Sequence, residues 1–196
     1  MFCSFNNTSK ITPAVFDVWM RLLHAVPDSV LWLFAANRQA EDNLRREAAS
    51  RGTDQARVVF APHRPPPEHL ARIPLADLFL DTLPYNAHVT ACDALSMGLP
   101  IVTCAGRSFA SRVAGSLLRC VGLPELVTTS LPDYEALALR LAADRGALAA
   151  IRARLAAAIP TAPLFDSERT TRQIEAAYEK MVELWRQGRP PESFSV

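Results

Sequence analysis

The sequence predicts an α/β fold, in which helices cover both faces of a doubly wound parallel sheet. Short apolar runs alternate with amphipathic or charged segments over residues 1–104. One of these runs, SVLWLF at 29–34, shows no alternation of apolar and polar residues, as expected of a parallel strand buried on both faces. From residue 108 onward the pattern is helical, so C-terminal helices are expected to follow the sheet.

Each expected strand is a short apolar run bounded by polar or proline-containing residues. The expected strands are 2–5 (FCSF), 29–34 (SVLWLF), 57–62 (RVVFAP), 77–82 (DLFLDT) and 100–104 (PIVTC). Because a helical or charged segment separates each strand from the next, the strands are expected to run parallel.

The first helix has the clearest signals of those expected. Thr12 and Pro13 suit its cap and first turn. Its apolar residues recur at intervals of three and four and form one stripe: Val15, Val18, Trp19, Leu22, Leu23 and Val26. The helices are expected at 13–26, 39–50 (ended by Gly52), 88–98, 108–121, 132–143, 145–158 and 167–187, with a shorter one near Glu68.

Composition excludes several classes of protein. Lys and Arg total 21 against 20 Asp and Glu, and a net charge of +1 provides no overall field to attract nucleic acid or an anionic membrane. No apolar stretch approaches the ~20 residues that span a bilayer. The four cysteines have no metal-binding spacing and three lie in apolar segments, so they are expected to be reduced core thiols of a cytoplasmic protein: Cys3, Cys92, Cys104 and Cys120.

Three polar segments follow expected strands at the edge where ligands bind in such sheets: NNTSK, HRPPPEHLAR and YNAHVTACD. If a helix begins near His88, the N–H groups of Val89, Thr90 and Ala91 are free donors that suit a phosphate. Lys10, on the first segment, can add the positive charge. The sequence therefore predicts an anion site where these segments meet.

Other side chains of these segments suit the rest of a nucleotide. The hydroxyl of Thr90 can join the phosphate site, and Asp93 can accept from a sugar hydroxyl. His69 and Arg72 lie three residues apart, so a helix would place them on one face, where they could flank a flat base. Two plainer interpretations remain open: Asn86, His88 and Asp93 only cap a helix, and His69 and Arg72 form a solvated surface pair.

Several common sites are missing from the sequence. No G-x-G-x-x-G follows the first strand, and no G-x-x-x-x-G-K-[ST] occurs, which argues against a standard dinucleotide site and against a P-loop NTPase. The histidines form no metal-ligand cluster, so metal-free chemistry is expected.

Six segments of the chain resemble, in order and spacing, the C-terminal catalytic half of the O-linked N-acetylglucosamine transferases. They are FNNTSKI, SVLWLF, RVVFAP, EHLARIPLADLFLDTLPYNAHVTACDALSMGLPIVT, ASRVAGSLL and APLFD, and residues 68–118 are the most specific part. The resemblance implies a Rossmann-like domain of a GT-B glycosyltransferase. It also implies inverting, metal-independent transfer of N-acetylglucosamine from UDP-GlcNAc to protein Ser and Thr, with no cofactor.

The resemblance also implies roles for individual residues. Lys10 pairs with the diphosphate and Asn7 lies near it. His69 stacks on uracil with Arg72 beside it, and Arg64 is a further substrate-binding residue. His88 and Thr90 grip the diphosphate together with the backbone at Val89, and Asp93 binds the ribose. Pro66 and Val89 depart from the family, which usually has a lysine and a threonine there, so one charge and one hydroxyl are absent.

The resemblance gives two expected parts: a UDP-binding domain at 1–165, and a C-terminal helix and tail at 166–196 that packs back on it. The family's other catalytic half and its tetratricopeptide repeats are expected partners in a full-length protein and supply much of the acceptor site. The chain alone is therefore expected to bind UDP-sugar but to transfer poorly, and no general base is assigned. A non-catalytic nucleotide-binding or assembly module is the alternative.

Overall fold

The computed structural model describes residues 1–35 and 37–196. The described residues form one parallel sheet in the order β3-β2-β1-β4-β5-β6. The strands are β1 (Phe2–Ser4), β2 (Leu31–Phe34), β3 (Val58–Ala61), β4 (Leu78–Leu80), β5 (Ile101–Cys104) and β6 (Val127–Thr128). In this order the chain reverses direction across the sheet between β1 and β4, which is the point where doubly wound sheets bind ligands. The expected fold class is confirmed.

The helices follow the strands in the expected alternation. They are α1 (Pro13–Ala25), α2 (Arg38–Ser50), α3 (Pro66–Arg72), α4 (Val89–Ser96), α5 (Val113–Cys120), α6 (Leu131–Ala143), α7 (Arg145–Ala158) and α8 (Ser167–Arg186). Helix α1 packs beside α6, and α4 packs beside α5. The predicted start of α1 is confirmed, because the hydroxyl of Thr12 accepts from the N–H of Val15 and Pro13 opens the helix.

The core lies between the sheet and these helices and includes nearly the whole predicted stripe of α1. Val15, Val18, Trp19, Leu22 and Leu23 are all buried, and Val26, just after the helix, is partly buried. The Trp19 indole N–H donates to the hydroxyl of Tyr134 over 3.1 Å, which links α1 to α6 through a buried polar contact.

Two local predictions differ from the structure. The segment 108–121 is a 3-10 turn, Phe109–Ser111, followed by the shorter α5. Ser111 is buried and folds back onto Ser108 and Gly106, and the next residue, Arg112, has φ −125° and ψ −10°, outside helical geometry, so the helix is interrupted there. Strand β6 was not expected, because two residues are too few to show a periodic pattern.

The cysteines are only partly as expected. All four are free thiols, and Cys3 and Cys104 are buried. Cys120 is exposed and Cys92 is only half buried, so the prediction of four core thiols is wrong for these two. Cys120 is the last residue of α5, where the helix surface faces solvent.

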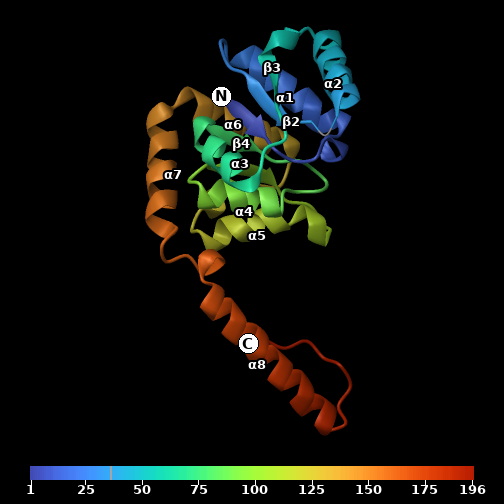
Figure 1. The fold of residues 1–196 in the computed structure, drawn as a ribbon, viewed down its shortest axis with the longest axis vertical. Helices are drawn as coiled ribbons and strands as arrows, with labels where there is room; N and C mark the ends of the chain where they lie inside the picture. The colour runs from blue at the N-terminus through green and yellow to red at the C-terminus, as the bar shows by residue number, and fades with distance from the viewer. Residues whose placement is uncertain (36) are drawn as a thin grey trace.

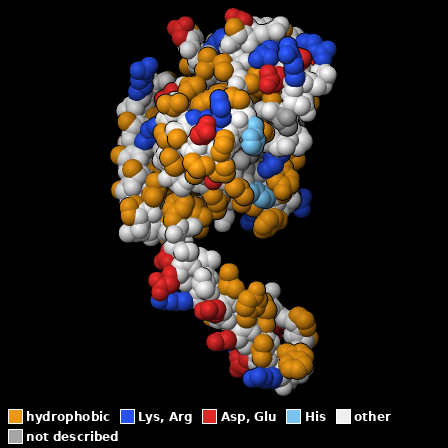
Figure 2. Space-filling model, in the orientation of Figure 1, with side chains coloured by type: hydrophobic (Ala, Val, Ile, Leu, Met, Phe, Trp, Pro, Cys, Tyr) orange, Lys and Arg blue, Asp and Glu red, His pale blue; other side chains and the backbone are white. Residues whose placement is uncertain are grey.

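Helix α8 differs from expectation in its position. It extends away from the domain rather than packing back on it (Figure 1). Apolar side chains cover much of its visible surface (Figure 2), and Trp185 is 77% exposed. Only Leu184 of this helix is buried, and it lines a hollow together with Pro190, Pro191 and Phe194 of the following tail, while most other large apolar side chains of α8 remain exposed. No helix in the described part of the chain is long and apolar enough to cross a membrane.

Candidate functional site

The carboxyl ends of β1 and β4 bring Lys10 and the 85–90 segment together. Lys10 lies in the 3-10 turn Thr8–Lys10 that follows β1. Its Nζ donates to the backbone oxygen of Asn86 over 3.0 Å and lies 4.2 Å from the centre of the Tyr85 ring. Two loops that are 76 residues apart in the sequence therefore meet on one rim of the sheet, as expected from the sequence.

The start of α4 offers two free backbone donors at this rim. Within the described chain, no acceptor is found for the N–H groups of Val89 and Thr90. The N–H of Ala91 donates to the oxygen of His88 over 3.0 Å, so the expectation of three free donors is wrong by one. A first-turn bond of the 3-10 type uses the third donor. We call Lys10, these two N–H groups and the Thr90 side chain the cradle.

The histidine that begins α4 does not cap it. His88 is the N-cap residue, but no side chain makes a capping hydrogen bond there. Its ring stacks on Tyr85 with centroids 5.0 Å apart and meets Phe109 edge-on at 6.1 Å. Asn86 is buried and donates through Nδ2 to the oxygen of Thr82 over 2.8 Å. The plainer interpretation, in which these side chains only cap the helix, therefore does not describe the structure.

His69 and Arg72 form an interlocked pair on α3 rather than a solvated one. Arg72 donates from Nε and Nη2 to Nδ1 of His69, over 3.1 and 2.7 Å, and from Nη1 to the oxygen of Pro62 over 2.7 Å. The His69 ring lies edge-on to Phe5, 5.3 Å between centroids. Because Nδ1 accepts, the His69 proton is on Nε2.

The electrostatics of this pair extend to Asp93. Burial lowers the pKa of His69, and the nearby Arg72 charge lowers it further. Burial raises the pKa of Asp93, while His69 opposes that rise, so the two side chains sense each other across the rim. The imidazole on α3 and the partly buried carboxylate on α4 therefore lie within range of each other's electrostatic influence.

Among the described residues, the side chains of Asn7 and Arg64 make no hydrogen bond or ion pair with the cradle, although the backbone oxygen of Asn7 accepts from the N–H of Lys10 over 3.0 Å. Asn7 is exposed and accepts from the N–H of Ser9 over 3.0 Å, so it caps a turn. Arg64 is exposed and lies 3.8 Å from Glu68. Its positive charge contributes to the lowered pKa of Arg72, behind the burial of Arg72 itself.

Sequence reasoning missed a buried polar network beneath the cradle. Asp81 is 2% exposed; its Oδ1 accepts from Asn6 Nδ2 (3.2 Å) and from the N–H groups of Thr82 and Ala87 (2.7 Å each), and its Oδ2 accepts from Thr103 (2.6 Å). Burial raises the pKa of Asp81 to about 6, although these hydrogen bonds oppose the rise. The available signal was an aspartate that ends an apolar strand in LFLDT.

The network reaches the cradle through Asn6. The hydroxyl of Thr90 donates to Asn6 Oδ1 over 2.7 Å. The resemblance implies a role for the neighbouring Asn7, but Asn6 is the residue that is buried and hydrogen-bonded to Thr90.

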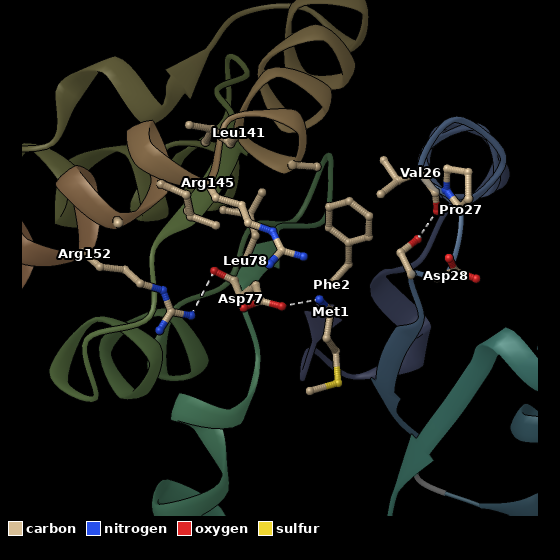
Figure 3. Close-up of a pocket in the computed structure, with 14 residues that line it drawn as sticks. Met1, Phe2, Val26, Pro27, Asp28, Asp77, Leu78, Leu141, Arg145 and Arg152 are labelled. Atoms are coloured by element: carbon tan, nitrogen blue, oxygen red, sulfur yellow. Dashed lines mark hydrogen bonds and ion pairs between the residues drawn. The ribbon is translucent and has the colours of Figure 1, made fainter.

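A separate hollow lies at the other end of the strands. Its volume is about 680 Å³, and Met1, Asp77, Arg145 and Arg152 are among its lining residues (Figure 3). Because these residues lie before β1 and β4 or on α7, the hollow is distinct from the cradle. The described residues contain no group of three or more His, Cys, Asp or Glu that could hold a metal ion.

Comparison with known proteins gives a consistent result. The profile of the family described as Glycosyl transferase family 41 matches residues 1–174. A UDP-N-acetylglucosamine--peptide N-acetylglucosaminyltransferase of Caenorhabditis elegans is 38% identical over 97% of this chain and 16% of its own length. A probable enzyme of the same name from Arabidopsis thaliana, SEC, is 36% identical over 100% of this chain and 20% of its own.

Solved structures agree in fold. A mutant of the O-GlcNAc transferase of Thermobaculum terrenum superimposes with a TM-score of 0.85 at 35% identity, over 92% of this chain and 35% of that one. The lipopolysaccharide glycosyltransferase WaaG superimposes with a TM-score of 0.63 at 16% identity, over 88% and 46%, which shows the fold alone. The chain spans only 16 to 20% of the length of the two curated relatives named above. It belongs to glycosyl transferase family 41 and has the fold of one half of a GT-B glycosyltransferase.

Proposed function

We propose that this chain is the donor-binding half of an inverting, metal-independent glycosyltransferase that moves N-acetylglucosamine from UDP-GlcNAc to protein Ser and Thr. The observation that carries the proposal is the meeting of Lys10 with the 85–90 segment at the switch point of the sheet. An ammonium and two free N–H groups at a helix start are the donors that a diphosphate requires.

The same groups can act in the reaction. When UDP leaves the sugar, negative charge builds on its β-phosphate. Lys10 and the helix donors would stabilise that charge more in the transition state than in the bound donor, which lowers the barrier. The protein thereby supplies fixed positive charge at the leaving group.

The neighbouring side chains suit the nucleoside. Burial and then the Arg72 charge lower the pKa of His69, which favours the neutral ring, and the hydrogen bonds from Arg72 fix its orientation, so a flat ring is available to stack on uracil. Asp93 is near enough for His69 to influence its pKa, as expected if His69 meets the base and Asp93 the ribose. The acceptor site and the general base are assigned to parts of a longer protein, and the chain alone is expected to bind UDP without transferring sugar.

Calorimetric titration with UDP tests the proposal. Lys10→Ala should weaken UDP binding by about tenfold or more, because a charge-assisted contact to phosphate is lost. Lys180→Ala is the matched control, since Lys180 lies on α8 and pairs only with Glu183 among the described residues. Equal affinities for UDP and NAD, or a Lys10→Ala variant that binds as wild type does, would exclude this function.

The exposed apolar face of α8 favours a second candidate, a non-catalytic module that assembles with another chain. The two candidates differ in a transfer assay. If UDP binds, the chain is mixed with a separately produced N-terminal half of a family member, UDP-GlcNAc and an acceptor protein. Sugar transfer that depends on both halves and on Lys10 supports the enzyme, and a stable complex without transfer supports the module.

A further inference from the structure

We propose that Asp81 is a positioning residue of the cradle: its carboxylate holds Thr90 and Lys10, the side chains expected to meet the phosphates, without contacting the ligand itself. The inference rests on the proposed function, because it adds a residue to the same site. Two chains of hydrogen bonds lead from this one buried carboxylate to the cradle.

The first chain runs through Asn6 to Thr90. The amide nitrogen of Asn6 donates to Asp81 Oδ1 and to Thr82 Oγ1, over 3.2 and 2.9 Å. An ionised carboxylate only accepts, so it determines that the amide nitrogen faces it and that the amide oxygen faces the other way. That oxygen accepts from the hydroxyl of Thr90 over 2.7 Å. Asp81 thereby fixes the hydroxyl on the first turn of α4.

The second chain runs through the 82–87 turn to Lys10. The N–H groups at both ends of this turn, those of Thr82 and Ala87, donate to the same Oδ1 over 2.7 Å each. The turn carries the backbone oxygen of Asn86, which accepts from Lys10 Nζ over 3.0 Å. Because Oδ1 closes the turn, it also determines where the ammonium is held.

The charge of Asp81 acts on the cradle as well. Burial lowers the pKa of Lys10, and the negative charge of Asp81 opposes that shift. A charged carboxylate beneath the cradle therefore helps Lys10 to remain an ammonium before a phosphate arrives. Burial raises the pKa of Asp81 to about 6, which means that the charged form is destabilised inside the protein. Buried ionisable groups with strongly shifted pKa values are concentrated at functional sites.

Three variants test the inference by UDP calorimetry, at a temperature where circular dichroism shows each one folded. Asp81→Ala removes the acceptor of both chains and should raise the Kd by about tenfold or more. Asp81→Asn removes the charge but keeps an oxygen at the Oδ1 position, with its amide nitrogen facing Thr103, so only the weaker electrostatic support of Lys10 is lost and its Kd should stay within about threefold of wild type. Tyr134→Phe is the control, because its hydroxyl donates to the backbone oxygen of Asp81 over 3.0 Å and not to the carboxylate.

The outcomes separate the two proposals. The Kd of Tyr134→Phe should stay within about twofold even though the variant is less stable. A folded Asp81→Ala with the wild-type Kd, or a Tyr134→Phe variant weakened as much as Asp81→Ala, overturns the positioning role alone. If Asp81→Ala does not fold, Asn6→Ala decides: it cuts one chain, and about threefold weaker binding supports the role, whereas an unchanged Kd overturns it. Wild-type protein that does not bind UDP overturns the proposed function and this inference with it.

Discussion

The two edges of the sheet are chemically opposite. At the carboxyl edge, free N–H groups at the start of α4 and the ammonium of Lys10 provide donors and positive charge. At the amino edge, arginine side chains instead donate hydrogen bonds to backbone oxygens. Arg57 donates to the oxygens of Leu23, Val26 and Ser29 at and just beyond the end of α1. Arg152 donates to the oxygen of Asp77 (Figure 3) and to that of Ala76.

Helix direction explains this difference. In a doubly wound sheet the helices run antiparallel to the strands, so helix N-termini lie at the carboxyl edge and C-termini at the amino edge. The first expose N–H groups and the second expose oxygens. A cationic side chain at the amino edge therefore donates to the free backbone oxygens of helix ends, whereas one at the carboxyl edge is available to an anionic ligand. Two arginines line the amino-edge hollow, but Arg152 is already engaged by backbone oxygens.

The largest expected effect concerns the carboxylate that the carboxyl edge buries. Asp81 has a pKa raised to about 6, against an ordinary value of 3.8, so the folded chain binds its proton more tightly than the unfolded chain does. Its contribution to the free energy of unfolding is therefore greatest below pH ~4 and constant above pH ~6. Between these pH values the protein loses about 3 kcal/mol of stability.

Asp81→Asn isolates this effect, because it is neutral at every pH. We expect the variant to match wild type near pH 4 and to gain up to about 3 kcal/mol relative to it by pH 7, by urea unfolding at both pH values. A stability difference that does not change between the two pH values would show that burial of this charge costs little.

The next effect concerns the amino edge. Arg57→Ala removes a guanidinium that donates to three backbone oxygens and to Ser29 Oγ, over 2.8 to 3.0 Å. We expect a loss of about 2 kcal/mol in the free energy of unfolding, because partly buried oxygens lose their donor. The Kd for UDP should not change, since Arg57 serves the opposite edge. Weaker UDP binding by folded Arg57→Ala would break the proposed division between the edges.

The sequence predicts the fold better than the buried part of the site. Apolar runs that alternate with helical segments are long-range patterns, and they predict five of the six strands. Strand β6 has two residues and pairs with Thr103 and Cys104 across 24 positions, so no local pattern announces it. The direction in which α8 leaves the domain is likewise not evident from local sequence. An amphipathic pattern predicts that one face of a helix is buried, but it does not identify the surface that buries it.

The site shows the same limit at the scale of one residue. Lys10 and Thr90 follow from the position of their loops at the carboxyl edge. Asn6 and Asn7 are chemically identical neighbours, yet Asn6 is 1% exposed and bonded to Asp81, while Asn7 is exposed. Which of the two points inward depends on where β1 ends, and the ends of short strands are the least predictable part of a sequence pattern.

The smallest expected effect tests whether solvent exposure or position at a helix end determines how much an amino-edge arginine contributes to the free energy of unfolding. Arg154 resembles Arg57 in donating to the backbone at the end of a helix, since its Nη2 lies 2.8 Å from the oxygen of Gly122 just after α5. It also pairs with Glu125, but its side chain is 54% exposed, so water can replace the lost donor and screen the charge. Arg154→Ala should therefore cost only about 0.5 kcal/mol by urea unfolding, with no effect on UDP binding. A loss as large as that of Arg57→Ala would mean that the helix end itself, and not the burial of its oxygens, makes these arginines necessary.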